Sequence, residues 1–354
     1  MGELVASRLL TVNHRAGAST AGVSVPILSK YDTDAEDSFA RATAPYLSLY
    51  WEAGRNEGKD IPSYAGAPTD NFDAVYSGAS AKVFSGAGRL LTQCADGKLA
   101  LVGSLLGTSF SATRASGSNV LTGVSSIAYL VIGQGISGTG IPGGATIDAI
   151  DAAAATVTLS VPATASGTST LTAAALANDA GHAIVATTPL ITSTEDWTIL
   201  MVIEPQIVSG TQVILSTATY PALNRVAIKI ATTGVVAVDN GAATPENAQA
   251  NVGIANGVRS LFWVSFKAST KQVLIGGRNA TPAGSTTWAN GFAASVGGAG
   301  ETIGGVPNTV GGIQQAGQAL ILMRAKIPAF AADVPELQTI LDAHAVKFGG
   351  NGLN

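Results

Sequence analysis

The stretch Arg225-Val226-Ala227-Ile228-Lys229-Ile230 places Val226, Ile228 and Ile230 on one face of an extended chain. This follows because successive side chains of a β-strand point to opposite sides. Similar runs, rich in Val, Ile, Thr and aromatic residues, recur along the chain between Gly, Asn and Pro residues. They cover residues 99–102, 198–203, 212–216, 234–238, 261–266, 272–275 and 319–323. Short strands at such regular spacing predict a mainly β protein, an antiparallel β-sandwich.

One helix is predicted to close the chain. Asp333 and Glu336 have the spacing of a capping box, and Gly349-Gly350 end the helical pattern. Leu337, Ile340, Leu341 and Phe348 form its apolar stripe.

The first 75 residues differ in composition from the rest of the chain. Residues 1–60 carry 14 charged side chains, whereas residues 99–188 carry only 4. One helix is expected here, capped by Asp34 and ended by Pro45. We interpret residues 1–75 as an arm that attaches the protein to a larger assembly.

Residues 116–175 form a Gly/Ser/Thr/Ala-rich segment that predicts a small β-module inserted into the sandwich. It begins with an alternation of Ser125, Ile127, Tyr129 and Val131 and continues through glycine-rich turns. Two short alternating strands come next, at residues 145–151 and 156–160. The sandwich itself is then assigned to residues 76–115 and 176–354.

The overall composition excludes several classes of protein. Charged residues make up only 12% of the 354 residues, while 46% are hydrophobic, which excludes an intrinsically disordered chain. The net charge of −4 argues against nucleic-acid binding, which needs a basic face. No apolar run approaches the length of a membrane span, and Met1-Gly2-Glu3 lacks the basic start of a secretory signal. We therefore expect weakly charged surface to be buried between subunits.

Two resemblances narrow the class of protein. Residues 133–168, "GQGISGTGIPGGATIDAIDAAAATVTLSVPATASGT", resemble a module found in tailed-bacteriophage virion proteins. Residues 192–205, "TSTEDWTILMVIEP", and 257–279, "GVRSLFWVSFKASTKQVLIGGRN", resemble the concanavalin-like and laminin-G-like jelly roll of phage tail fibres and capsid surfaces. The last helix, "ELQTILDAHAVKFG", is similar to that of phage versions of this domain.

The sequence contains no complete motif for catalysis, for a cofactor or for a metal ion. Gly133-x-Gly135-x-x-Gly138 matches the dinucleotide fingerprint in form, but Pro142 forbids the helix that must follow it. The acidic run at residues 32–37 lacks the Gly and Glu of a calcium loop, although a calcium ion held between loops elsewhere stays open. His14, His182 and His344 have no ligand spacing to one another or to Cys94, the single cysteine. We predict that the protein is not an enzyme and needs no cofactor.

Carbohydrate contact is the sharpest candidate for a binding site. One candidate loop holds Tyr220, Asn224 and Arg225, and a second holds Trp288, Asn290 and Phe292. An exposed aromatic ring would supply a stacking platform, and the amide and guanidinium groups would bind hydroxyls. The alternative for Trp288 is packing in the core or between subunits, which we favour.

The resemblance implies a structural protein on the surface of a tailed-phage virion, a tail fibre, spike or capsid decoration made in the host bacterial cytoplasm. Its expected partners are other virion proteins, through residues 1–75, and itself, as a homotrimer. A host-surface glycan is a further expected partner. The alternatives are a carbohydrate-binding adhesin module and, third, a glycan-degrading enzyme.

Overall fold

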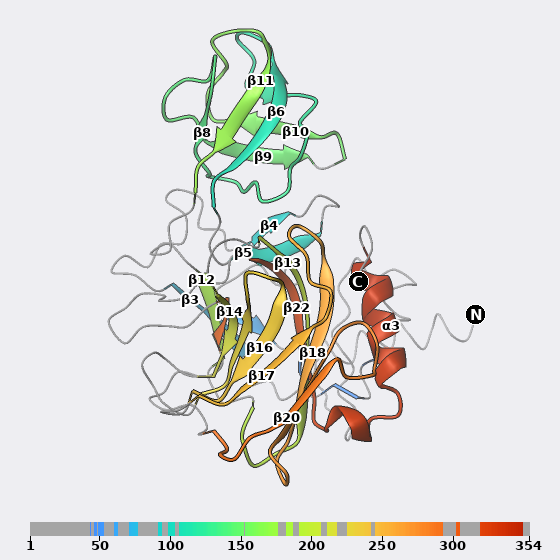
Figure 1. Ribbon diagram of the computed structural model, residues 1–354. Helices are drawn as coiled ribbons and strands as arrows, with labels where there is room; N and C mark the ends of the chain where they lie inside the picture. Colours follow the sequence, from blue (N-terminus) through green and yellow to red (C-terminus); the bar gives the residue numbers. More distant parts are fainter. Residues whose placement is uncertain are drawn as a thin grey trace, which may run out of the picture.

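The computed structural model describes residues 43, 46–47, 49–52, 60–62, 71–76, 91–93, 98–102, 106–151, 153–175, 182–186, 191–206, 211–217, 225–241, 245–292, 302–304 and 319–349. In these residues the protein is an antiparallel, jelly-roll-like β-sandwich that carries a small β-unit at one end and a C-terminal helix at one side (Figure 1). The predicted fold class is therefore confirmed. The helix expected between Asp34 and Pro45 lies almost wholly outside the described residues.

The first sheet of the sandwich has eight strands, in the order β20-β19-β18-β13-β22-β5-β4, with β1 also paired to β22. The strands are β20 (Gly284–Thr287), β19 (Gln272–Gly276), β18 (Ser260–Lys267), β13 (Trp197–Pro205), β22 (Ala319–Ile327), β5 (Leu99–Val102), β4 (Leu91–Gln93) and β1 (Leu49–Glu52). β13 is buried along its whole length, in agreement with the apolar run at residues 199–203 in its centre.

The second sheet also has eight strands, in the order β17-β16-β15-β14-β21-β12-β3-β2. They are β17 (Asn247–Asn251), β16 (Val235–Asp239), β15 (Ala227–Ile230), β14 (Gln212–Ser216), β21 (Thr302–Ile303), β12 (His182–Ala186), β3 (Asn71–Tyr76) and β2 (Asp60–Pro62). Ile228, Val236 and Val238 join the main core, whereas Asn247 and Gln249 are exposed on the opposite face of their strands. Alternation in the sequence therefore identifies the core-facing side of this sheet.

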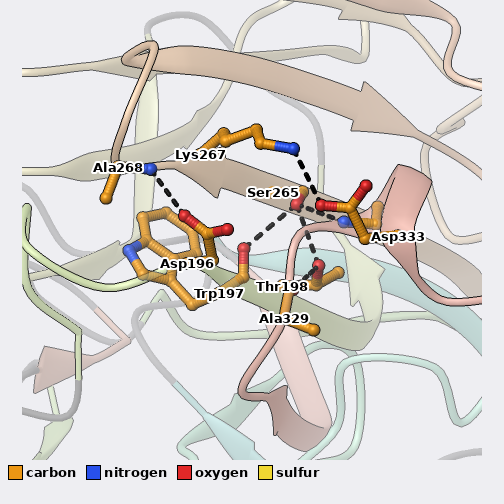
Figure 2. Close-up of polar contacts among 9 residues, drawn as sticks. Asp196, Trp197, Thr198, Ser265, Lys267, Ala268, Ala329 and Asp333 are labelled. Carbon is orange, nitrogen blue, oxygen red and sulfur yellow. Dashed lines mark hydrogen bonds and ion pairs between the residues drawn. The ribbon is translucent and has the colours of Figure 1, made fainter.

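The C-terminal segment covers the outer face of the first sheet. It consists of the short helix η2 (Ala331–Asp333) and helix α3 (Leu337–Phe348). Figure 2 shows one bond that fixes the segment, in which the hydroxyl of Thr198 donates to Ala329 O (2.7 Å). The N–H of Ala331 also donates to Ser265 Oγ (2.8 Å). Thr198 and Ser265 are completely buried, so this hydrogen bonding satisfies polar groups that would otherwise be costly.

The predicted capping box of α3 does not form. Glu336 makes no side-chain capping bond, and Asp333 accepts instead from Lys267 Nζ (2.8 Å) across the sheet surface. The helix is held by its buried stripe, which includes all four predicted apolar positions.

The β-unit, residues 108–175, lies between β5 and β12 in the chain and above the sandwich in Figure 1. It contains two three-stranded sheets, β7-β10-β9 and β6-β11-β8. The strands are β6 (Thr108–Arg114), β7 (Val120–Leu121), β8 (Ile136–Ser137), β9 (Ile147–Asp151), β10 (Thr156–Leu159) and β11 (Gly167–Ala173). β6 pairs with β11 from end to end, so the unit begins before residue 116, the start expected from composition.

The glycines of the "SGTGIP" stretch pack closely against side chains of β6 and β11. Gly140 has a φ of +72°, and a Cβ there would lie 2.6 Å from Nε of the buried Arg114. A Cβ on Gly138 would lie 2.6 Å from the side chain of Leu171. These glycines serve close packing, and no helix follows them, so the dinucleotide pattern is coincidental.

Tyr129 joins the β-unit to the sandwich. It has a φ of +62°, is buried within the main core cluster, and donates from its hydroxyl to Pro205 O (2.8 Å). The strand expected from the alternation of residues 125–131 is wrong, because the chain turns here to deliver this ring. Such a conformation costs about 1–3 kcal/mol and persists only where surrounding contacts impose it.

Candidate ligand-binding surface

The two ends of the sandwich differ in what they carry. At one end, the N–H of Gly257 and the hydroxyl of Tyr129 both donate to Pro205 O, so this end holds the β-unit. β18 runs away from it for 8 residues, or about 25 Å. At the far end, Lys271 Nζ donates to Ala289 O (2.6 Å), so the segments around these two residues lie together there.

We call the polar group at this far end the distal loop end. It consists of Arg225, Asn240, Glu246, Asn247, Lys271 and Asn290. The segments that carry these residues lie at the ends of β15, β16, β17, β19 and β20. Connections at the end of a rigid sandwich are common positions for binding residues.

Glu246 holds the distal loop end together. Its carboxylate accepts from the N–H of Ala289 (2.6 Å) and of Asn290 (3.0 Å), and from the amide of Asn240 (2.7 Å). Asn240 Oδ1 accepts in return from the N–H of Glu246 (3.1 Å). The bonds from Ala289 and then Asn290 hold the pKa of the Glu246 carboxyl below its ordinary value of 4.5, against a smaller opposing effect of burial.

Arg225 lies against the same turn. Gly241, with a φ of +59°, packs so closely that a Cβ would come within 2.9 Å of Arg225 Cγ. Asp239 Oδ1 accepts from the N–H of Gly241 (3.1 Å), and its other oxygen pairs with Lys229 on β15. The turn after β16 is thus fixed to the end of β15.

The structure therefore brings together one residue from each predicted sugar-binding loop. Arg225 is half-buried against Gly241, and Asn290 is exposed, with its carbonyl oxygen 3.5 Å from Asn240 Nδ2. Tyr220 and Asn224 lie outside the described residues.

The predicted role of Trp288 and Phe292 needs correction. Trp288 is 2% exposed and Phe292 is 3% exposed. Phe266 lies between them, with ring centroids 6.0 Å from Trp288 and 5.3 Å from Phe292. Neither ring can be a stacking platform, and packing, the alternative favoured for Trp288, is what the structure shows.

Ser265 and His344 are two buried polar side chains of the core. Ser265 is completely buried, and its hydroxyl donates to Trp197 O (3.0 Å). His344 is completely buried on α3, where burial lowers its pKa to about 4.

Among the described residues, no group of three or more His, Cys, Asp or Glu side chains is placed to hold a metal ion. Within the same residues, no helix is long and apolar enough to cross a membrane.

Sequence reasoning missed Asn240, Glu246, Asn247 and Lys271. A signal was present for part of this group, since Asn247-Ala248-Gln249-Ala250-Asn251 alternates polar and small apolar residues. Such a strand exposes a row of amides. The backbone partners of Glu246, at Ala289 and Asn290, lie 43 and 44 positions further along the chain, and no local pattern indicates them.

Comparisons with known proteins give a fold likeness only. No protein-family model matches the chain, and no curated protein matches it. Among solved structures, it is similar to the CBM40 of the Ruminococcus gnavus IT-sialidase bound to alpha2,3 sialyllactose, at 14% identity and a TM-score of 0.36, covering 42% of this chain and 83% of that one. It is also similar to the NanB sialidase from Streptococcus pneumoniae, at 14% identity and a TM-score of 0.35, covering 41% of this chain and 24% of that one.

A third similar structure is Domain 4 of AbnA, a GH43 extracellular arabinanase from Geobacillus stearothermophilus, in complex with arabinotriose. It shares 14% identity at a TM-score of 0.36, covering 59% of this chain and 87% of that one. At TM-scores of this size the likenesses carry no argument about function. The assignment to the β-sandwich class rests on the strand pairings described above.

Proposed function

We propose that the sandwich is a carbohydrate-binding domain and that it binds its glycan at the distal loop end. The observation that carries the proposal is the cluster of amide and charged groups that the Glu246 hydrogen bonds hold at the end opposite the β-unit. Because the backbone at Ala289 and Asn290 is already fixed, binding would not have to order it.

The chemistry of this surface matches sugar hydroxyls. A hydroxyl both donates and accepts, and the exposed amides of Asn247 and Asn290 do the same. Arg225 adds a guanidinium donor, and Lys271 adds an ammonium group. Both signs of charge are present, which favours a polar ligand over a polyanion such as nucleic acid.

The test is a binding panel on the intact chain. Sialyllactose and arabinotriose are sensible first probes, followed by bacterial surface polysaccharides on an array. For any glycan that binds, Asn290→Ala and Asn247→Ala should each weaken the Kd about fivefold, since one lost hydrogen bond is worth about 1 kcal/mol.

The matched control is Asn119→Ala, which removes an exposed amide from the β-unit. It should leave the affinity unchanged. Equal weakening by Asn119→Ala, or no weakening by either distal variant, would place the glycan elsewhere and contradict the proposal.

The role on a tailed-phage virion stays a prediction, as do attachment through residues 1–75, the homotrimer and the absence of enzymatic activity. A display role and glycan binding are compatible, because a surface protein that binds a host glycan acts as an adhesin. Light scattering gives the mass of the purified protein, and a multiple of 35.3 kDa would support the oligomer. A monomer at micromolar concentration would count against it.

A further inference from the structure

Asn-Gly pairs are chemically reactive, and this chain has three of them in the described residues: Asn240-Gly241, Asn256-Gly257 and Asn290-Gly291. The glycine nitrogen can lose its proton to solvent and attack the Asn side-chain carbonyl carbon. That step forms a cyclic imide and expels ammonia, and water then opens the imide to aspartate or isoaspartate. Glycine permits the attack because it has no Cβ to obstruct it.

Two of the pairs are protected by hydrogen bonds. The N–H of Gly241 donates to Asp239 Oδ1 (3.1 Å), and the N–H of Gly257 donates to Pro205 O (2.8 Å). The Asn240 side chain is also completely buried and bonded to Glu246. A nitrogen that donates a hydrogen bond is held away from the neighbouring side chain, so the attack requires local opening first.

The third pair has the weakest protection, because the Asn290 side chain bonds to Glu246 but is not buried. Asn290 is exposed, and the N–H of Gly291 donates no hydrogen bond to any residue within the described ranges. Gly291 does not have a positive φ, unlike Gly241 and Gly257 at +59° and +69°. Among the described residues, no hydrogen bond therefore holds the Gly291 nitrogen away from the Asn290 side chain.

We infer that Asn290-Gly291 is a site of spontaneous deamidation and that the reaction alters the distal loop end. The product carries a new carboxylate on the residue whose N–H binds Glu246 Oε2 (3.0 Å), so two negative groups become neighbours. The isoaspartate form also lengthens the main chain by one methylene group, which displaces the N–H groups that bind Glu246. The inference rests on the loop geometry and does not require that a glycan binds there.

The experiment is peptide mapping by mass spectrometry after the intact protein is incubated at mildly alkaline pH. The Asn290 peptide should gain the mass difference between an amide and a carboxylic acid several-fold faster than the Asn240 and Asn256 peptides. Asn351-Gly352 lies outside the described residues and falls in a separate peptide.

Gly291→Ala is the matched variant. A Cβ there would contact Ser193 at 3.4 Å and 3.6 Å, which is ordinary packing, so the variant should fold with an unchanged melting temperature and lose the modification. Deamidation of Asn240 or Asn256 at the rate of Asn290 would overturn the inference. So would an Asn290 peptide that stays unmodified in the wild-type protein, or a folded Gly291→Ala protein that deamidates at the wild-type rate.

Discussion

His344 should make the stability of the sandwich depend on pH. The imidazole is completely buried on α3, and its Nδ1 lies 2.7 Å from Ile340 O. Burial is the main cause that lowers its pKa from 6.5 to about 4, with Lys347 adding to the effect and the contact with Ile340 opposing it.

The sign is set by proton uptake. Between pH 6.5 and 4 the folded state keeps His344 neutral while the unfolded state binds a proton, so acidification favours unfolding. The stabilising contribution is complete above pH 6.5 and is lost as the pH falls towards 4. At 1.36 kcal/mol per pKa unit, the free energy of unfolding should drop by about 2 kcal/mol between pH 7 and pH 5, and by about 3 kcal/mol in total.

Urea unfolding followed by tryptophan fluorescence measures this. All 4 tryptophans lie outside residues 108–175, so their signal reports on the sandwich alone. His344→Leu should remove the drop of about 2 kcal/mol between pH 7 and pH 5. Val346→His is the control, since Val346 is 80% exposed on the same helix and a histidine there should titrate alike in both states. Parallel pH curves for the wild type and His344→Leu would refute the reasoning.

Three further predictions concern packing, charge and the β-unit. Trp288→Ala should destabilise the protein by about 3–5 kcal/mol in thermal or urea unfolding, as expected for a buried ring, whereas a change within about 0.5 kcal/mol would mean an exposed one. The Glu246 carboxylate contributes stability above its ordinary pKa of 4.5, and this contribution is lost as the pH falls through the lowered pKa of the folded state. Glu246→Gln should therefore lose less stability than the wild type on acidification below about pH 4.5. The same variant should speed hydrogen exchange at the N–H groups of Ala289 and Asn290, and unchanged exchange there would contradict the role given to Glu246. Replacement of residues 108–173 by a short Gly/Ser linker should leave cooperative unfolding of the sandwich intact, because Thr108 and Ala173 are paired neighbours and the ends to be joined lie close together. Loss of cooperative unfolding would show that the β-unit is an integral part of the sandwich.

The sequence predicted what depends on local periodicity. All eight strand-like runs fall on strands of the sandwich, because alternation and β-branched composition are local properties. Residues 125–131 show the limit of that reasoning. Their alternation resembles a strand, yet Tyr129 turns inward to reach Pro205, 76 positions away.

The candidate site was predictable only in part. Residue type alone identified Asn290 and Arg225 as candidate binding residues. Their approach to the Asn240-Gly241 turn depends on which strand ends meet at one end of the sandwich. Trp288 has no strand pattern around it, and its ring packs against Phe266, which is distant in sequence. Contacts of this kind are set by tertiary packing and leave no periodic trace.

The central claim is that a glycan binds at the distal loop end, and backbone amide NMR tests it most directly. Titration of the isotope-labelled protein with a glycan identified on the array should shift the amide signals of Glu246, Asn247, Ala289 and Asn290. Signals of the β-unit, at the opposite end of the sandwich, should stay in place. Shifts confined to the β-unit, or none with any glycan on the array, would contradict the account.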